Sequence, residues 1–173
     1  MVQSCEYGRC YAVKIITIIP EDFVNYKVAS LTIEFPYCTF KCGKSVCQNS
    51  ALAHSPKIDI SSADLLERYY LNDPITSAIV LQGLEPLDSF DDVLDIIRTL
   101  RISYHNNDPV VIYTGYTEDE VADKISQLAP FGNIIVKFGR YIPNQKPHYD
   151  DVLGVNLASD NQYAAILDKH PIK

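Results

Sequence analysis

The chain has 173 residues, of which 47% are apolar; this is enough for one hydrophobic core, so we expect a single domain over residues 1–173. Its net charge of −7 disfavours nucleic acids and anionic membrane surfaces as partners, because both carry negative charge. No stretch approaches the ~20 apolar residues of a membrane span, and the N-terminal region lacks the layout of a secretion signal. The cysteines number five, an odd count, and with no such signal they favour a reducing, cytoplasmic location.

Short apolar runs predict a β-sheet. Residues 11–19 and 28–35 are typical of strands, and the second run alternates between two faces. Three later runs are rich in Val and Ile and have no polar face, namely residues 78–81, 110–113 and 134–136. Strands without a polar face are typical of parallel sheets, which are covered on both sides.

Three helices are predicted between these strands. The first covers residues 63–71 with Ser61 as its N-cap, and the second, the clearest of the three, follows Ser89. The third begins at the cap Thr117, where Glu120 completes a capping box. The alternation of strands and helices predicts the α/β class, with helices packed on a largely parallel sheet.

Two further segments are expected to be polar and solvated. Residues 139–151 combine two prolines with polar residues, which predicts an extended loop. Asp91, Asp92 and Asp95 are expected to form the solvated face of the second helix.

Three cysteines cluster just after the strand at residues 28–35, where α/β folds bind their ligands. Cys38, Cys42 and Cys47 lie in one loop, and Gly43 allows the backbone to fold tightly there. Three thiolates can hold a four-iron cluster with one iron left open to a further ligand. With His54 they can instead form a closed zinc site of the Cys₃His type, which is normally structural. A third possibility is that they are buried thiols without a metal. The more distant pair, Cys5 and Cys10, offers two ligands for a second metal, but without neighbouring ligands we interpret these thiols as unliganded.

The cysteine loop resembles that of the radical S-adenosylmethionine (SAM) enzymes, in particular the activating proteins of anaerobic ribonucleotide reductase. Further stretches fit that family in the same order: residues 22–25 (DFVN), 82–87 (QGLEPL), 113–117 (YTGYT), 139–141 (GRY) and 158–162 (ASDNQ). The second of these resembles the family's Gly-Gly-Glu-Pro motif, with Leu84 in place of the second glycine. The cysteine spacing is CxxxCxxxxC, two residues longer than the family's usual motif.

The resemblance implies a partial (β/α) barrel with a mostly parallel sheet and helices on the outside. It implies that three cysteines ligate a [4Fe–4S] cluster and that SAM binds the remaining iron. The residues expected to hold the cluster are Cys38, Cys42 and Cys47, and those expected to contact SAM are Val46, Cys47, Gln48, Gly83, Leu84 and Glu85. Glu85 is expected to brace its turn or to meet the ammonium group of SAM.

The activity implied by the resemblance is the reductive cleavage of SAM to a 5′-deoxyadenosyl radical. In the activating proteins this radical generates a glycyl radical on a partner enzyme, such as an anaerobic ribonucleotide reductase. A low-potential donor such as flavodoxin or ferredoxin is the expected source of the electron. Two alternatives remain at this point: a radical SAM enzyme acting on a small molecule or peptide, and a non-enzymatic binding module stabilised by zinc.

Overall fold

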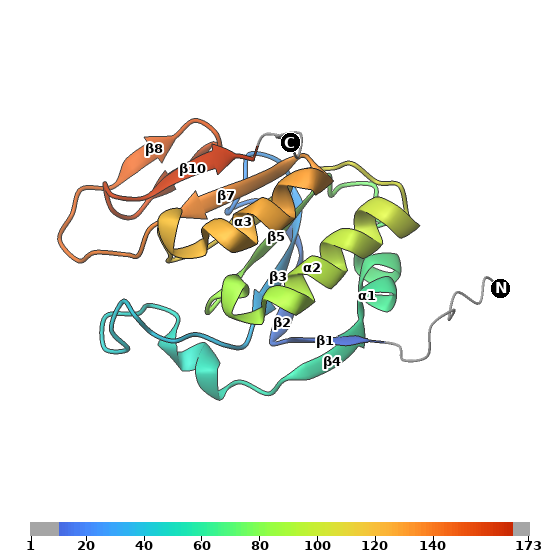
Figure 1. The fold of residues 1–173 in the computed structure, drawn as a ribbon, viewed down its shortest axis with the longest axis horizontal. Helices are drawn as coiled ribbons and strands as arrows, with labels where there is room; N and C mark the ends of the chain where they lie inside the picture. Colours follow the sequence, from blue (N-terminus) through green and yellow to red (C-terminus); the bar gives the residue numbers. More distant parts are fainter. Residues whose placement is uncertain (1–10, 168–173) are drawn as a thin grey trace.

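The computed structural model describes residues 11–167, which form a central sheet with helices packed against it and two small two-stranded sheets (Figure 1). The strands are β1 (Ala12–Ile15), β2 (Thr17–Asp22), β3 (Ser30–Phe35), β4 (Ile58–Ser61), β5 (Ala78–Gly83), β6 (Val110–Tyr113), β7 (Ile134–Phe138), β8 (His148–Asp150), β9 (Val155–Leu157) and β10 (Tyr163–Ile166). The α-helices are α1 (Ser62–Tyr69), α2 (Phe90–Arg98) and α3 (Ala122–Leu128). Single helical turns complete the list: η1 (Ser50–His54), η2 (Pro86–Ser89), η3 (Thr99–Ser103), η4 (Asp119–Val121) and η5 (Ala129–Phe131).

The central sheet has six strands in the order β10-β7-β6-β5-β3-β2. Its four inner strands are parallel to one another, whereas the edge strands β2 and β10 are antiparallel to their neighbours. This confirms the predicted α/β class with a mostly parallel sheet. The strands of residues 11–167 do not close into a barrel, and the partial barrel stays a prediction.

The three helices all pack on one face of the sheet (Figure 1). There the alternate side chains Leu31, Ile33 and Phe35 of β3 are buried against α1 and α2. The opposite face carries a smaller apolar cluster, which includes Val80, Leu153 and the loop residue Tyr26. Both faces are therefore covered, which explains why the inner strands have no polar face.

The run at residues 11–19, predicted to be one strand, is two strands in different sheets. β1 pairs with β4, which was not predicted, and β2 pairs with β3. The backbone N–H of Lys14 donates to Asp92 Oδ2 at 3.2 Å, and the Tyr11 hydroxyl donates to Asp92 Oδ1 at 2.7 Å. Asp92 is therefore buried, and the predicted solvated face was wrong at this residue because β1 lies against it.

The first two helices were predicted closely, and the third begins later than expected. Asp64 N–H donates to Ser61 Oγ at 3.0 Å, which confirms the first N-cap. At Thr117 only half of the capping box forms: the Thr117 N–H donates to Glu120 at 2.9 Å, and a single turn, η4, precedes α3. The predicted loop at 139–151 contains β8 at its end. No helix among residues 11–167 is long and apolar enough to cross a membrane.

The packing of α2 predicts a large difference between two isoleucines close together in the chain. Ile97 is fully buried in the main core, whereas Ile102 in η3 is 62% exposed. Ile97→Ala should lower the free energy of unfolding by about 2–5 kcal/mol, and Ile102→Ala by no more than about 0.5 kcal/mol. Urea denaturation followed by circular dichroism measures both. Equal losses in the two variants would contradict the packing described here.

Candidate functional site

The candidate site lies where β3 and β5 end, because their pairing continues beyond the strands themselves. The Leu84 N–H donates to the Phe35 carbonyl at 3.2 Å, and the Glu85 N–H donates to the Tyr37 carbonyl at 2.9 Å. These two hydrogen bonds hold the start of the cysteine loop beside the turn at residues 83–86. The carboxyl ends of parallel strands are the usual place for ligands in such folds.

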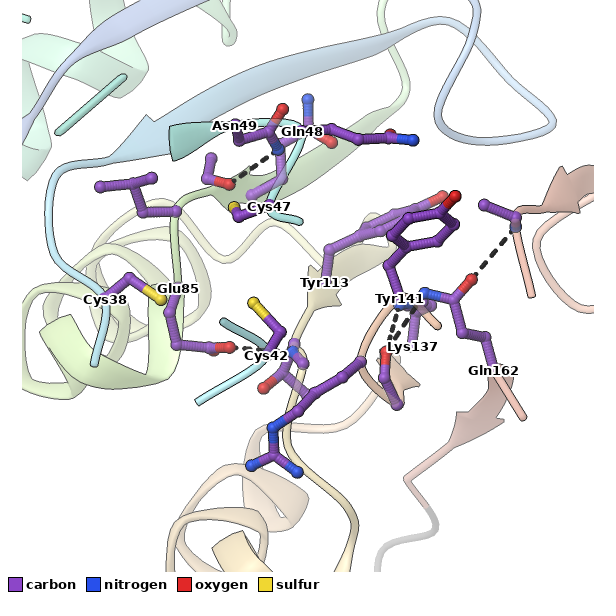
Figure 2. Close-up of a pocket in the computed structure, with 18 of the residues that line it drawn as sticks. Cys38, Cys42, Cys47, Gln48, Asn49, Glu85, Tyr113, Lys137, Tyr141 and Gln162 are labelled. Atoms are coloured by element: carbon purple, nitrogen blue, oxygen red, sulfur yellow. Dashed lines mark hydrogen bonds between the residues drawn. The ribbon is translucent and has the colours of Figure 1, made fainter. Parts of the chain in front are cut away.

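A cavity of about 380 Å³ opens at this edge of the sheet, within the size range of small-molecule sites. All of the site residues expected from the sequence line it: Cys38, Cys42, Val46, Cys47, Gln48, Gly83, Leu84 and Glu85. Figure 2 labels the three cysteines, Gln48 and Glu85 among them. Segments that resembled the SAM enzymes farther along the chain reach it too, at residues 113–116, 139–141 and 158. The structure therefore brings the expected residues together, while their individual roles stay predictions.

The three cysteines are half-buried, free thiols. The N–H of Phe40 donates to Cys38 Sγ at 3.1 Å, and Gly43 adopts a φ of 90°, which lets the loop turn back so that Cys47 N–H reaches the Gly43 carbonyl at 3.2 Å. Burial raises the pKa of Cys38 to about 11, and burial also raises the pKa of Cys42. Both are thus protonated at neutral pH without a metal, and binding iron would release their protons.

The donor set fits an iron–sulfur cluster better than a single zinc ion. Among residues 11–167, no three His, Cys, Asp or Glu side chains converge closely enough to hold one metal ion. His54 is exposed in η1 and does not line the cavity, so the Cys₃His site is not assembled in this structure. A four-iron cluster takes each thiolate at a different iron, so it needs thiolates that surround a larger centre.

Glu85 is 4% exposed and joins the turn after β5 to the turn after β6. Its carboxylate accepts hydrogen bonds from the backbone N–H groups of Leu87 at 3.1 Å and Gly115 at 2.8 Å. Burial raises the pKa of Glu85, and these hydrogen bonds oppose that shift. The side chain therefore braces the wall of the cavity, one of the two roles expected for it.

Gly83 is the position in the turn that requires glycine. Its φ is 108°, and a Cβ there would lie 2.7 Å from the backbone nitrogen of Phe35. Leu84 is not among the residues of positive φ, so the leucine at the second glycine position of the motif causes no backbone strain. The Gly83 carbonyl accepts a hydrogen bond from Asn49 Nδ2 at 3.2 Å, which ties the end of the cysteine loop to the turn.

A buried lysine lines the far side of the cavity and was not predicted from the sequence. Lys137 of β7 is 7% exposed, and its Nζ donates to the Gly139 carbonyl at 2.8 Å. Burial lowers the pKa of Lys137 to about 8, and the charge of Glu85 acts in the opposite direction. The only signal in the sequence was a lysine interrupting an apolar strand. Gln162 Nε2 donates to the same carbonyl at 3.2 Å, so the closing stretch of the chain also supports this wall.

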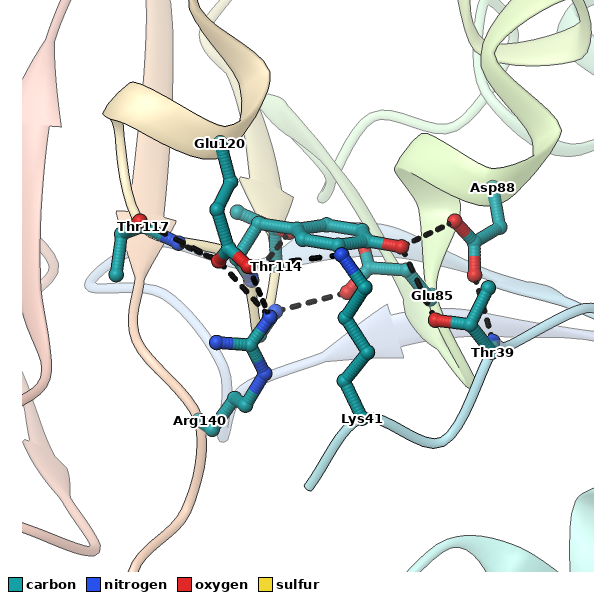
Figure 3. Close-up of polar contacts among 10 residues, drawn as sticks. Thr39, Lys41, Glu85, Asp88, Thr114, Thr117, Glu120 and Arg140 are labelled. Carbon is teal, nitrogen blue, oxygen red and sulfur yellow. Dashed lines mark hydrogen bonds and ion pairs between the residues drawn. The ribbon is translucent and has the colours of Figure 1, made fainter. Parts of the chain in front are cut away.

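Polar contacts around Tyr116 hold the rim of the cavity together, and they too were missed. Figure 3 labels the side chains around it, including Thr39, Asp88 and Arg140. The Tyr116 hydroxyl donates to Asp88 at 2.7 Å and lies 3.1 Å from the hydroxyl of Thr39 in the cysteine loop. Lys41 and Arg140 both lie over the Tyr116 ring, with Lys41 Nζ 4.8 Å from its centroid.

Arg140 in turn binds both oxygens of Glu120 at 2.8 Å, which lowers the pKa of Glu120 to about 2. These residues come from four separate segments, so no local pattern in the sequence indicates the cluster they form.

The family of 4Fe-4S single cluster domains matches residues 5–162, which is most of the chain and includes all three clustered cysteines. The chain belongs to this family. Membership in the 4Fe-4S single cluster domains supports a [4Fe–4S] cluster as the cofactor, and an iron–sulfur protein is what the resemblance to radical SAM enzymes implied. Neither the curated proteins nor the solved structures contain a match to the chain. Cys5 and Cys10 lie outside the described residues.

The ligand assignment predicts that three substitutions have the same effect. Cys38→Ala, Cys42→Ala and Cys47→Ala should each prevent assembly of a four-iron cluster, because each removes a thiolate from a different iron. His54→Ala should bind iron and sulfide as the wild type does. Iron and sulfide content and visible absorption after anaerobic reconstitution measure this. A full cluster in any one cysteine variant would refute the assignment, and loss of metal from His54→Ala would restore the zinc alternative.

The bracing role of Glu85 predicts a loss of stability in the metal-free protein. Glu85→Ala leaves the buried N–H groups of Leu87 and Gly115 without their acceptor, which should cost about 1–3 kcal/mol. Glu118→Ala, at an exposed glutamate just before η4, should change stability by less than about 0.5 kcal/mol. Urea denaturation of both variants tests this. An unchanged midpoint for Glu85→Ala would show that the carboxylate is not a structural brace.

Proposed function

We propose that this 4Fe-4S single cluster domain is a radical SAM protein that generates a glycyl radical on a partner enzyme. The observation that carries the proposal is that the cysteine loop and the QGLEPL turn line one cavity at the carboxyl ends of the parallel strands. The cavity between the QGLEPL turn and the cysteines supports SAM in particular. An iron–sulfur protein that only transfers electrons has no need of a small-molecule cavity beside its cysteines.

In this proposal Cys38, Cys42 and Cys47 hold the cluster, and the backbone of Gly83 and Leu84 faces the methionine end of SAM. Val46, Cys47 and Gln48, which line the cavity on the side of the cysteine loop, would lie beside its nucleoside. The bound cluster and SAM supply the chemistry, which is one-electron cleavage of the sulfonium to methionine and a 5′-deoxyadenosyl radical.

The chain's own residues bind, orient and shield. Glu85 joins the turn at residues 83–86 to the turn after β6, and the hydrogen bond from Asn49 to Gly83 joins that same turn to the cysteine loop. Both ends of SAM would therefore meet preformed surfaces. Lys137 places a buried amine at the far wall, where it offers donors to a polar or anionic group. The Tyr116 contacts keep the cysteine loop against the sheet, which limits the access of water to the radical.

A glycine Cα of a partner protein is the proposed source of the abstracted hydrogen atom. The support for this target is the resemblance to activating proteins, which extends to segments that line or border the cavity, at residues 113–117, 139–141 and 158–162. A low-potential electron donor is the second proposed partner, because cleavage consumes one electron in each turnover.

Anaerobic reconstitution tests the proposal. The reduced protein with SAM should release 5′-deoxyadenosine and methionine, and the Cys42→Ala variant should release neither. With an anaerobic ribonucleotide reductase added, electron paramagnetic resonance should show a glycyl radical that depends on SAM. A reduced cluster that leaves SAM intact would refute the proposal. Cleavage of SAM without a glycyl radical on such a partner would direct the search to a small molecule or peptide.

A further inference from the structure

The positive charges around the cysteines are unusual for this chain. From Phe35 to Ile58 the sequence contains Lys41, Lys44 and Lys57 and not one Asp or Glu, although the whole chain has a net charge of −7. This segment therefore carries only positive charge in a chain that is acidic overall. Residues 124–149 also lack Asp and Glu, but there Lys137 is buried and Arg140 is bound to Glu120. A charge distribution of this kind orients a charged partner as it approaches.

The structure places these lysines on an exposed surface with apolar side chains among them. Tyr37 is 41% exposed and Val46 is 38% exposed. Lys57 Nζ lies 4.2 Å from the centroid of the Tyr37 ring, and Lys44 Nζ lies 5.7 Å from that of Phe40. We call the surface formed by Lys41, Lys44, Lys57, Tyr37 and Val46 the lysine face. Exposed apolar side chains together with charged ones are usual in transient protein interfaces.

Two of the three lysines are free to meet a partner. Lys41 lies 3.5 Å from Glu120, whose carboxylate is also bound by Arg140. Within residues 11–167, Lys44 and Lys57 form no ion pair, and both are exposed. Their charges are thus not neutralised by the acidic remainder of the chain.

The lysine face also lies next to the proposed cluster. Lys41 precedes Cys42 directly, and Lys44 follows it by two positions, while the three thiols are only half-buried. A protein docked here would bring its own redox group close to the cluster, with little protein between the two redox centres. Interfaces of electron-transfer partners are small, so a face formed by one loop is large enough to serve.

We propose that the lysine face is the docking site of a one-electron donor protein with an acidic surface. This inference rests on the proposed function, in which an electron must reach the cluster before SAM is cleaved. The donor is oxidised by one electron and the cluster is reduced by one, with no transfer of atoms. An acidic donor is repelled by the net negative charge of the chain and attracted by the exposed, unpaired Lys44 and Lys57 of the lysine face, so charge favours both this partner and its orientation.

Stopped-flow reduction of the reconstituted cluster tests the proposal without SAM, and therefore independently of SAM cleavage. With an acidic reduced ferredoxin at low salt, the Lys44→Glu/Lys57→Glu variant should show a second-order rate at least about tenfold below that of the wild type. At about 0.5 M salt the difference should largely disappear, because salt screens exposed charges. Bleaching of the cluster's visible absorption measures both rates.

Two controls isolate docking from damage to the cluster. Arg98→Glu makes the same change in charge at the C-terminal end of α2, which lies at the opposite end of the sheet, and should reduce normally. An uncharged small photoreductant such as a deazaflavin should reduce all variants at the wild-type rate. If the double variant holds less iron, Lys57→Glu alone provides the test, because Lys57 lies outside residues 38–47, which contain the three cysteines.

Three results would overturn the proposal. The first is a wild-type rate with ferredoxin in the variants of the lysine face. The second is an equal slowing in Arg98→Glu, and the third is equally fast reduction by a donor with a basic surface. A protein whose cluster accepts electrons through the lysine face but leaves SAM intact would support docking and refute the proposed function, so the two failures are distinguishable.

Discussion

The parallel pairing of β3 with β5, continued past the ends of both strands, is the constraint on which the site depends. Backbone hydrogen bonds from Leu84 to Phe35 and from Glu85 to Tyr37 place two loops side by side that are far apart in the sequence. Because backbone groups form these hydrogen bonds, the spacing between the two loops does not depend on the loops' side chains. The cysteines of this loop are farther apart in sequence than those of the SAM enzymes that it resembles, but the start of the loop is held in place by these two hydrogen bonds.

A second level of organisation is electrostatic and depends on the neighbouring pairing of β5 with β6. The turns that follow these two strands are close together, so one buried carboxylate, Glu85, accepts hydrogen bonds from backbone N–H groups in both. The Tyr116 contacts join the cysteine loop to the segment after β6, and Arg140 binds Glu120 at the same rim. The cavity wall is thus polar and its side chains are hydrogen-bonded, whereas Lys44 and Lys57 form no ion pair within residues 11–167 and are exposed to solvent.

Local patterns in the sequence were enough to predict most of the fold. The inner strands are apolar on both faces and the helices carry one apolar stripe, so their periods identify them, and Ser61 caps α1 as expected. The errors lie where a long-range contact decides. The run at residues 11–19 divides between two sheets because Asp92 and β4 bind its first half, and neither contact has a local signal.

The sequence by itself determined the α/β class and the three thiols of one loop, since spacing and hydrophobic period are local properties, and its resemblance to the radical SAM enzymes indicated the turn at residues 82–87. Tertiary structure alone decided that Glu85 is a brace, that Lys137 is a buried amine in the cavity and that His54 stays apart from the cysteines. Each of these depends on which strands are neighbours and on how far their loops extend. Strand order arises from the packing of the whole chain and is not encoded in any short segment.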